Sequence, residues 1–395
     1  MTEDIAVRHF RDYLRIRTDV PNADYESAVG FLTGLGDEIG LRVKVVEVEP
    51  CLPVVILSLP GSVVSLSSIL LYSHMDVVPV DAECWKHHPF AAVKDENGDI
   101  YGRGAQDMKS IGIQYIEAIR RLKTKGPTFL RTVHVLFCPE EETNSAGMKA
   151  LMKHPTFAEL NVGFALNEGM PSVDNTYKLY YGERGVWISC VGTSGHASEF
   201  LQNTAAEKLR NVINTFLAVR DESQKKLAVN TDLKAGNIVT INLTKVEGGS
   251  IDALNVIPDR FDAFFDIRVP PHVDEQKFRE ELEKSVTQCG PGVSLDYLIV
   301  YHVSQLSANT LDNPFWAALV SCFEEMKLDY EKEIFPAGTD SRFLRKAGID
   351  AIGLSPMINT SQLLHQHNER LNEKTFLDGL DLYCKIIPKL ANVQA

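Results

Sequence analysis

Histidine and carboxylate side chains follow several short apolar segments of this sequence. These residues are His74 and Asp76 after residues 69–72, the triplet Glu140-Glu141-Glu142 after 133–137, Glu168 after 162–166, and His365, His367 and Glu369 after 351–354. A further carboxylate, Asp107, ends the glycine-containing turn 101–107. Carboxylates brought together repel one another, and burial raises that cost, so a cation must compensate. Imidazole and carboxylate groups without a thiolate pattern favour zinc or a similar divalent ion in an open catalytic site.

Two ions that share one of these ligands would form a two-metal centre, and paired ions serve hydrolysis. Each motif alone is weak. A His-x-Asp pair is more often a hydrogen-bonded pair at a strand end, and a glutamate triplet is more often a solvated helix start. Their joint occurrence after buried apolar segments is far more specific and predicts a hydrolytic metal site.

The apolar segments that precede these groups are typical of strands buried on both faces, because they are short and rich in β-branched residues. They are residues 54–59, 69–72, 133–137 and 162–166. Helical periodicity over 24–39 and 108–122 alternates with them, which predicts an α/β domain with a mostly parallel central sheet flanked by helices. Ligands of such sheets bind outside the carboxyl ends of the strands, where these side chains stand.

A different pattern begins near residue 180. Predicted elements follow in the order strand 186–191, helix 203–220, strands 238–246 and 260–269, helix 274–286 and strand 293–300. This order is that of a ferredoxin-like α+β module. The α/β pattern returns afterwards with helix 313–326, strand 351–354 and helix 373–390. We therefore expect a catalytic domain of residues 1–179 and 307–395, interrupted by an inserted domain of residues 180–306.

Composition limits the possible functions. A chain of 395 residues predicts about two domains. The net charge of −13 argues against nucleic-acid and membrane-surface binding, which favour basic faces. The polar first ten residues predict no secretory signal, and no apolar run approaches the roughly 18 residues of a membrane span. Scattered cysteines without a CxxC pair favour a reducing, cytoplasmic location.

Several segments, in their order along the chain, resemble the aminoacylase-1 branch of the dizinc aminoacylase and carboxypeptidase family. They are residues 73–80, 101–109, 139–142, 195–198, 204–209, 255–258, 338–342 and 364–371. The chain length also fits this family. Asn167 departs from the branch, which has aspartate before the glutamate ligand, but no ligand is lost.

The resemblance implies a centre of two Zn²⁺ per subunit. The implied ligands are His74, Asp107 and Glu168 for one ion, and Asp107, Glu142 and His365 for the other, with Asp107 as the bridge. His365 is chosen over His367 because the family pattern has histidine four residues before a glutamate, here Glu369. The family also implies a cis peptide bond between Asp107 and Met108.

The resemblance also implies the catalytic roles. Glu141 would be the general base, and Asp76 would fix the tautomer of His74. The choice of Glu141 within the triplet rests on the alignment of residues 139–142, since spacing alone does not distinguish the three glutamates.

The inserted domain would be a lid and dimerisation domain of a homodimer. His196 would stabilise the oxyanion in the partner's active site, and Asn255 and Arg268 would hold a substrate carboxylate. Arg342 is a second candidate for substrate binding. Local sequence leaves two alternatives open: His196 as a turn histidine and Arg268 as a structural salt bridge.

These features together predict zinc-dependent hydrolysis of small-molecule N-acyl-L-amino acids. A dipeptidase or carboxypeptidase of the same family is the enzymatic alternative, because it would share the catalytic apparatus. A non-catalytic binding relative is the alternative from another class. It is disfavoured because the ligands and Glu141 are all present.

Overall fold

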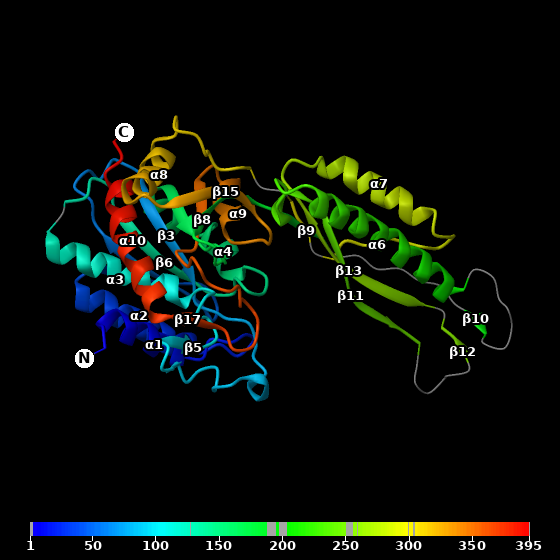
Figure 1. Cartoon of the computed structure of the whole chain (residues 1–395), viewed down its shortest axis with the longest axis horizontal. Coiled ribbons are helices and arrows are strands. Elements are labelled where there is room, and N and C mark those ends of the chain that lie inside the picture. Colours follow the sequence, from blue (N-terminus) through cyan, green and yellow to red (C-terminus); the bar gives the residue numbers. More distant parts are fainter. Residues whose placement is uncertain are drawn as a thin grey trace. The chain divides into compact units, whose positions relative to one another are not determined.

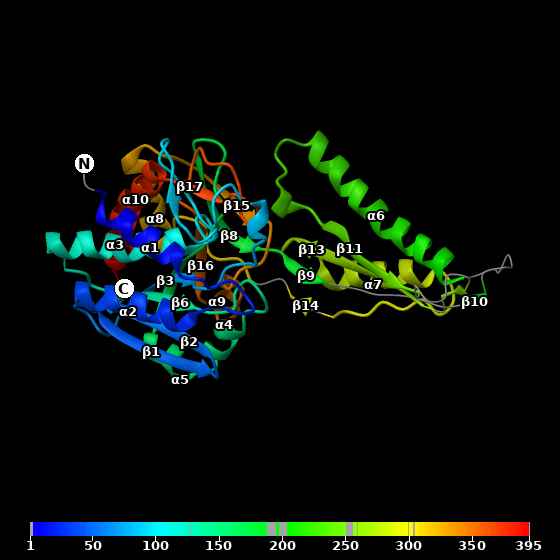
Figure 2. The ribbon, with the colours of Figure 1, turned by 90° about the horizontal axis from the view of Figure 1, so that it is seen from below.

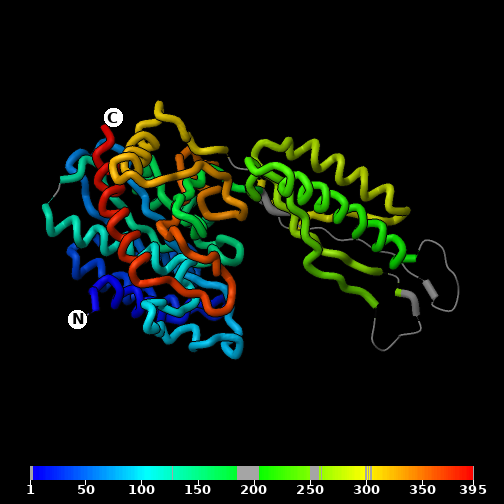
Figure 3. Tube along the Cα trace, in the orientation of Figure 1, coloured from blue at the N-terminus to red at the C-terminus, as the bar shows by residue number. Residues whose placement is uncertain are grey.

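The computed structural model describes residues 3–126, 128–187, 195–196, 204–249, 256–258, 260–298, 300–302 and 305–394. The chain divides into two compact units. Figures 1 and 3 show the course of the chain, coloured from blue at the N-terminus to red at the C-terminus. The first unit comprises Met1–Tyr181, Ser307–Lys332 and Thr339–Ala395, and the second comprises Gly182–Leu306 and Glu333–Gly338.

The first unit is built on an eight-stranded sheet with the order β1-β2-β6-β3-β7-β16-β8-β15. Its strands are β1 (Arg42–Glu49), β2 (Leu52–Leu59), β3 (Ser68–His74), β6 (Val133–Cys138), β7 (Val162–Asn167), β8 (Thr176–Glu183), β15 (Asp329–Phe335) and β16 (Asp350–Leu354). The central strands β6, β3, β7 and β16 are parallel, while β1, β2 and β8 pair antiparallel. The predicted α/β fold with a parallel sheet centre is therefore confirmed.

Helices cover both faces of this sheet because its central strands are apolar on both faces. Ile69 and Leu71 of β3 pack with one group of helices, and Leu70 and Tyr72 pack with the other. The first group is α1 (Ile5–Arg15), α2 (Tyr25–Ile39), α3 (Lys109–Lys125), α8 (Pro314–Met326) and α10 (Glu373–Ala391). The second group is α4 (Ala146–Leu151), α5 (Pro155–Leu160) and α9 (Ser341–Lys346). Figure 2 shows α8 and α10 on one side of the sheet and α5 on the other.

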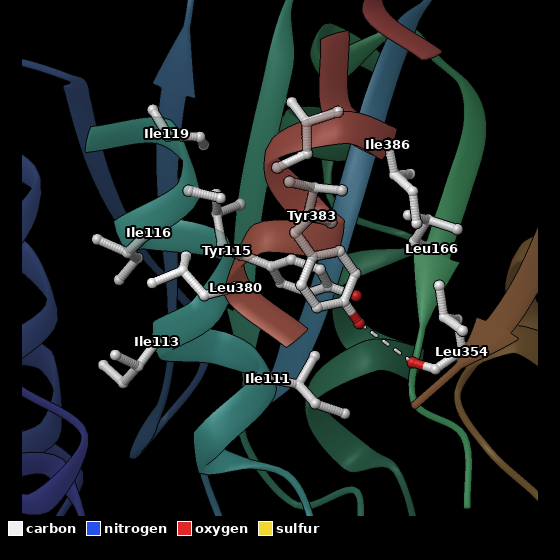
Figure 4. Close-up of a cluster of buried hydrophobic side chains, with 14 of the residues drawn as sticks. Ile111, Ile113, Tyr115, Ile116, Ile119, Leu166, Leu354, Leu380, Tyr383 and Ile386 are labelled. Carbon is white, nitrogen blue, oxygen red and sulfur yellow. Dashed lines mark hydrogen bonds between the residues drawn. The ribbon is translucent and has the colours of Figure 1, made fainter. Parts of the chain in front are cut away.

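The core between α3, α10 and the sheet is drawn in Figure 4. Tyr115 of α3 and Tyr383 of α10 meet edge to face with ring centroids 4.7 Å apart. The Tyr383 hydroxyl donates a hydrogen bond to the carbonyl oxygen of Leu354 at 3.2 Å. This bond satisfies a hydroxyl that would otherwise be buried among apolar side chains.

A small antiparallel sheet joins two distant segments of the first unit. It consists of β17 (Arg370–Asn372), β5 (Asp99–Tyr101) and β4 (Val93–Lys94), in that order. Arg370 lies opposite Tyr101, and the Gly102 N–H donates to the Glu369 carbonyl at 3.0 Å. The turn that ends at Asp107 therefore begins beside the segment that carries His365.

The second unit has the ferredoxin-like arrangement. Its elements are β9 (Gly185–Trp187), α6 (Ala205–Val229), β11 (Thr240–Gly248), β13 (Phe261–Val269), α7 (Glu275–Thr287) and β14 (Val300–Tyr301). The strand order is β11-β13-β9-β14, and neighbouring strands in this sheet pair antiparallel. Alternate residues of β13, from Ala263 to Val269, are buried against Val212 and Phe216 of α6 and Leu282 of α7. This period of two is what a sheet with one covered face requires.

Some elements differ from those expected. Strand 293–300 is limited to Val300–Tyr301, whose partner β9 is described only to Trp187. Helix 203–220 is observed as Ala205–Val229. Strands β1, β8 and β15 and helix α1 were not predicted. No helix in the described part of the chain combines the length and apolar character that crossing a bilayer requires.

Candidate metal and catalytic site

The parallel strands β3, β6 and β7 bring their carboxyl ends to one edge of the sheet. His74, the last residue of β3, lies opposite Cys138, the last residue of β6. The glutamate triplet follows Cys138 after Pro139, and Glu168 follows β7. The structure therefore places these predicted site residues together, because neighbouring parallel strands end side by side.

Asp107 lies between the two histidines of the site. Its Oδ1 is 3.1 Å from Nε2 of His74, and its Oδ2 is 3.3 Å from Nε2 of His365. Glu142 Oε2 is 3.0 Å from the same His365 nitrogen, and Glu168 Oε2 is 3.8 Å from Nε2 of His74. A carboxylate that directs one oxygen to each histidine has the geometry of a bridging metal ligand. The peptide bond between Asp107 and Met108 is cis, as the resemblance implied.

The donor set fits divalent cations. Oε1 of Glu142 and Oε1 of Glu168 are buried and have no hydrogen-bond partner among the described residues. Potential ligand atoms of His74, Asp107 and Glu142 lie within 4.8 Å of one another. Buried carboxylate oxygens without partners are costly, and a cation coordinated there would satisfy them.

The acid–base properties of the cluster agree with cation binding. Burial raises the pKa of Glu168 to about 8. Hydrogen bonds to Asp107 and Glu142 raise the pKa of His365 to about 10. Protons thus neutralise the cluster in the protein alone, and a divalent cation would displace them on binding.

Asp76 positions its neighbours through two different groups. Its main-chain carbonyl oxygen lies 2.8 Å from Nδ1 of His74, so Nδ1 carries the proton and the Nε2 lone pair is free for a metal. Its carboxylate accepts hydrogen bonds from the N–H groups of Glu141 at 3.1 Å and Glu142 at 2.9 Å. The carboxylate lies farther from the imidazole, at 3.7 Å. It holds the glutamate turn, while the carbonyl sets the tautomer.

The structure distinguishes the three glutamates, which spacing alone did not. The Glu140 carboxylate accepts hydrogen bonds from the Tyr25 hydroxyl at 3.1 Å and the Thr143 hydroxyl at 2.6 Å. Glu140 also has a left-handed backbone, with φ of 66°. This leaves Glu141 and Glu142 for the site, and one candidate ligand group combines Glu141 with His74 and Glu168. Burial and the nearby charges of Glu168 and Asp340 raise the pKa of Glu141 well above its usual range.

Arg342 lies beside the loop that follows Glu142. Its Nη2 donates to the Ser145 hydroxyl at 3.1 Å. The neighbouring Ser341 hydroxyl accepts a hydrogen bond from the side-chain amide of Asn167 at 2.9 Å, and the Asn167 oxygen accepts the N–H of Glu168 at 2.7 Å. The segment that carries Arg342 is therefore attached to the end of β7.

The remaining predicted site residues belong to the second unit. Nε and Nη2 of Arg268 donate to the two carboxylate oxygens of Asp266 at 2.6 and 2.7 Å. Arg268 therefore forms a salt bridge, as the structural alternative for this residue predicted. Asn255 lies outside the described residues. His196 belongs to the short strand β10 (Gly195–His196), where it pairs with Val256, but its side chain is not described.

Some residues that hold the candidate ligands in place could not be recognised from the sequence. Arg103 and Gln106 lie in the turn before the ligand Asp107, and both are buried, as is Glu369. The sequence indicated Glu369 as a carboxylate of the His365 segment but not its contacts. Tyr25 was noted only as a helix residue. Charged groups near a metal motif are a detectable signal, but their partners lie too far along the chain to be recognised locally.

Comparison with known proteins defines the class. Residues 70–389 match the model of peptidase family M20/M25/M40. The chain belongs to this family. The fold agrees with that of an M20 metallo-carboxypeptidase from Sulfolobus solfataricus, with a TM-score of 0.76 at 19% identity over 98% of this chain and 99% of that chain.

Within the family, the chain is similar to aminoacylase-1 over its full length. It is 46% identical to aminoacylase-1 from Homo sapiens over 397 residues, which is 100% of this chain and 97% of that protein. It is also 46% identical to aminoacylase-1A from Rattus norvegicus over 398 residues, with the same coverage. The predicted relation to the aminoacylase-1 branch is confirmed.

Proposed function

We propose that this protein is a metal-dependent aminoacylase that hydrolyses N-acyl-L-amino acids to a free amino acid and a carboxylate. One observation carries the proposal: Asp107 lies between His74 and His365, with Glu141 beside them, in a chain similar throughout to aminoacylase-1. Five ligands, of which the Asp107 carboxylate is shared, suit a pair of metal ions. We take these to be two zinc ions.

The ligands His74, Asp107 and Glu168 would hold one zinc ion, and Asp107, Glu142 and His365 the other. Bound there, the ions supply Lewis-acid activation of the amide carbonyl and of water. Glu141 accepts a proton from the attacking water and delivers it to the departing amine.

The second unit supplies the remaining groups as a lid and dimerisation domain. Asn255 and Arg268 hold the substrate carboxylate, because a guanidinium meets a carboxylate with two parallel hydrogen bonds. Arg342 of the first unit is a second candidate for substrate binding. Asp266 already pairs with Arg268, so it orients this guanidinium. His196 of the partner subunit in a homodimer stabilises the developing oxyanion. The scattered cysteines support a cytoplasmic location.

Hydrolysis of N-acetyl-L-methionine, compared with a panel of unblocked dipeptides, tests this function. We expect release of free methionine, loss of activity in a zinc chelator, recovery when zinc is restored, and little action on dipeptides. Preferred cleavage of dipeptides would assign the protein to the peptidase alternative. Absence of both activities from zinc-loaded protein would support the non-catalytic alternative.

A further inference from the structure

Two segments that carry ligands of the proposed metal centre are held together by hydrogen bonds of buried side chains. One is the turn that ends at Asp107, and the other runs from residue 361 to Arg370 and carries His365. The β17–β5 ladder brings their ends together. Beyond this ladder, the contacts are made by side chains that the catalytic proposal does not use.

Glu369 holds the first segment by its backbone. The side chain is fully buried, with an exposed fraction of 0%. One carboxylate oxygen accepts the N–H groups of Gln106 at 2.6 Å and Asp107 at 3.2 Å, and the other accepts the N–H of Gly104 at 3.1 Å. The main chain of the bridging ligand is therefore fixed by a carboxylate from the opposite segment.

Arg103 holds the second segment in the reverse direction. Its Nη1 donates to the Glu369 carboxylate at 2.7 Å and to the Gln366 carbonyl at 3.2 Å. Its Nη2 donates to the carbonyl oxygen of His365 at 3.3 Å. Each segment thus contributes one charged side chain that binds the backbone at a metal ligand of the other.

Gln106 adds a neutral link between the same segments. Its side-chain amide nitrogen donates to the carbonyls of Ser361 at 3.0 Å and Arg370 at 2.9 Å. Its side-chain oxygen accepts the N–H of Leu363 at 2.9 Å. The side-chain oxygens of Glu369, the side-chain amide of Gln106 and both Nη atoms of Arg103 therefore have partners across the junction, as buried polar groups favour.

His365 depends on such support more than His74 does. His74 ends a fully buried strand, and the Asp76 carbonyl fixes its ring. His365 lies outside helices and strands, with φ of 62° and 54% of its side chain exposed. Burial and regular structure therefore do not fix its position, and the contacts of its backbone must do so.

We propose that Arg103, Gln106 and Glu369 form a clasp that sets the affinity of the metal site made by Asp107, Glu142 and His365. This inference rests on the proposed metal centre. Two of the three ligands of that ion lie on clasped segments, against one of three for the ion held by His74, Asp107 and Glu168. Loosening the clasp therefore weakens the first site more than the second.

Zinc titration of the metal-free protein tests the clasp, with a chromogenic chelator as competitor. Arg103→Lys keeps the positive charge but loses the two Nη donors of the guanidinium. Glu369→Gln replaces one acceptor oxygen with an NH₂ group. We expect one zinc equivalent to bind about 10- to 100-fold more weakly in each variant, the usual effect of losing a partner behind a ligand. The other equivalent should change less, and saturating zinc should restore most of kcat.

Matched controls separate positioning from general loss of stability. Arg131, also buried, donates to the carbonyls of Ser67 and Val393 far from the ligands, and Arg131→Lys should leave both zinc affinities unchanged. Glu117 is buried with His9 and Arg120, so Glu117→Gln is the control for the carboxylate change. If a clasp variant does not fold, Gln106→Glu disturbs the same junction without removing the ion pair.

The outcomes are distinct. Unchanged zinc affinities in folded clasp variants, or an equal loss in the Arg131 and Glu117 controls, would overturn the clasp. Equal weakening of both equivalents would also overturn its selectivity for the His365 site. A wild-type protein that binds no zinc would instead refute the metal centre on which the inference rests.

Discussion

Neighbouring glutamates of one short segment have different environments, and this difference assigns their chemistry. The hydroxyls of Tyr25 and Thr143 hold the Glu140 carboxylate. Asp76 binds the backbone N–H groups of Glu141 and Glu142, and the two side chains lie in the candidate site, beside His74 and His365 respectively. A residue's role here follows from its hydrogen-bond partners and cannot be inferred from its type.

Substitution of Glu141 tests its assignment as general base. We expect Glu141→Ala to keep a metal content near that of the wild type and to lower kcat by about 10²- to 10⁴-fold, the usual contribution of a positioned acid–base group. Metal analysis and steady-state kinetics measure both quantities. Glu140→Gln is the control and should retain most activity. An active Glu141→Ala enzyme would remove Glu141 from the mechanism.

His134 makes stability depend on pH. The His134 ring lies between the Ser58 hydroxyl and the Leu160 carbonyl. Burial lowers the pKa of His134 from 6.5 to about 4, and the hydrogen bond to Leu160 only partly opposes this shift. The folded state therefore binds fewer protons than the unfolded state in this window, and stability falls as pH decreases from about 6.5 to about 4. The shift corresponds to roughly 3 kcal/mol.

Urea unfolding at several pH values measures this dependence. His134→Phe should flatten the curve between pH 6.5 and 4, although it also removes two hydrogen bonds. His272→Gln, at an exposed position, should leave the slope unchanged. A wild-type slope in the His134 variant would assign the acid sensitivity to other groups.

Helix α1 shows how an element outside the predicted pattern supports the sheet. Asp4 caps its first turn, accepting the N–H of Ala6 at 2.8 Å. Phe10 on its buried face stacks on Phe376 of α10 with ring centroids 4.7 Å apart. The helix thus packs against α10, which directly follows β17, and holds it against the core.

Removal of the Phe10 ring measures this contribution. We expect Phe10→Ala to lower the free energy of unfolding by about 3–5 kcal/mol, because it loses buried apolar area and leaves a cavity. Chemical denaturation provides the value. Arg8→Ala on the exposed face of the same helix should change it by less than about 0.5 kcal/mol. A small effect of Phe10→Ala would mean that α1 is not part of the cooperative core.

At the scale of the whole molecule, the proposed metal ligands and the proposed lid residues belong to different units. The ligands and Glu141 lie in the first unit, and His196, Asn255 and Arg268 lie in the second. In the proposed homodimer, each active site would combine residues of both subunits.

Mixing of inactive variants tests that arrangement. His196→Ala and Glu141→Ala should each be nearly inactive, and exchange of their subunits should restore roughly a quarter of wild-type activity. Half of the randomly formed dimers are mixed, and each has one complete site. Each variant taken alone through the same dissociation and reassembly is the control. No recovery after verified exchange would exclude His196 of the partner subunit from the site.

The sequence alone determined the local features. Apolar runs predicted β2, β3, β6 and β7, because strands buried on both faces have a continuous apolar pattern. The βαββαβ order of the second unit and the groups at the strand ends could also be predicted. Edge strands such as β1 escaped prediction, since half of its residues are exposed and charged.

Only the tertiary structure decided which groups act together. Arg103 and Glu369 are 266 positions apart, and no local pattern pairs them. The same holds for Tyr25 and Glu140, which are 115 positions apart. Local sequence encodes strand and helix preference through side-chain periodicity. The partner of a buried charge depends on chain topology, which brings distant segments within hydrogen-bond distance.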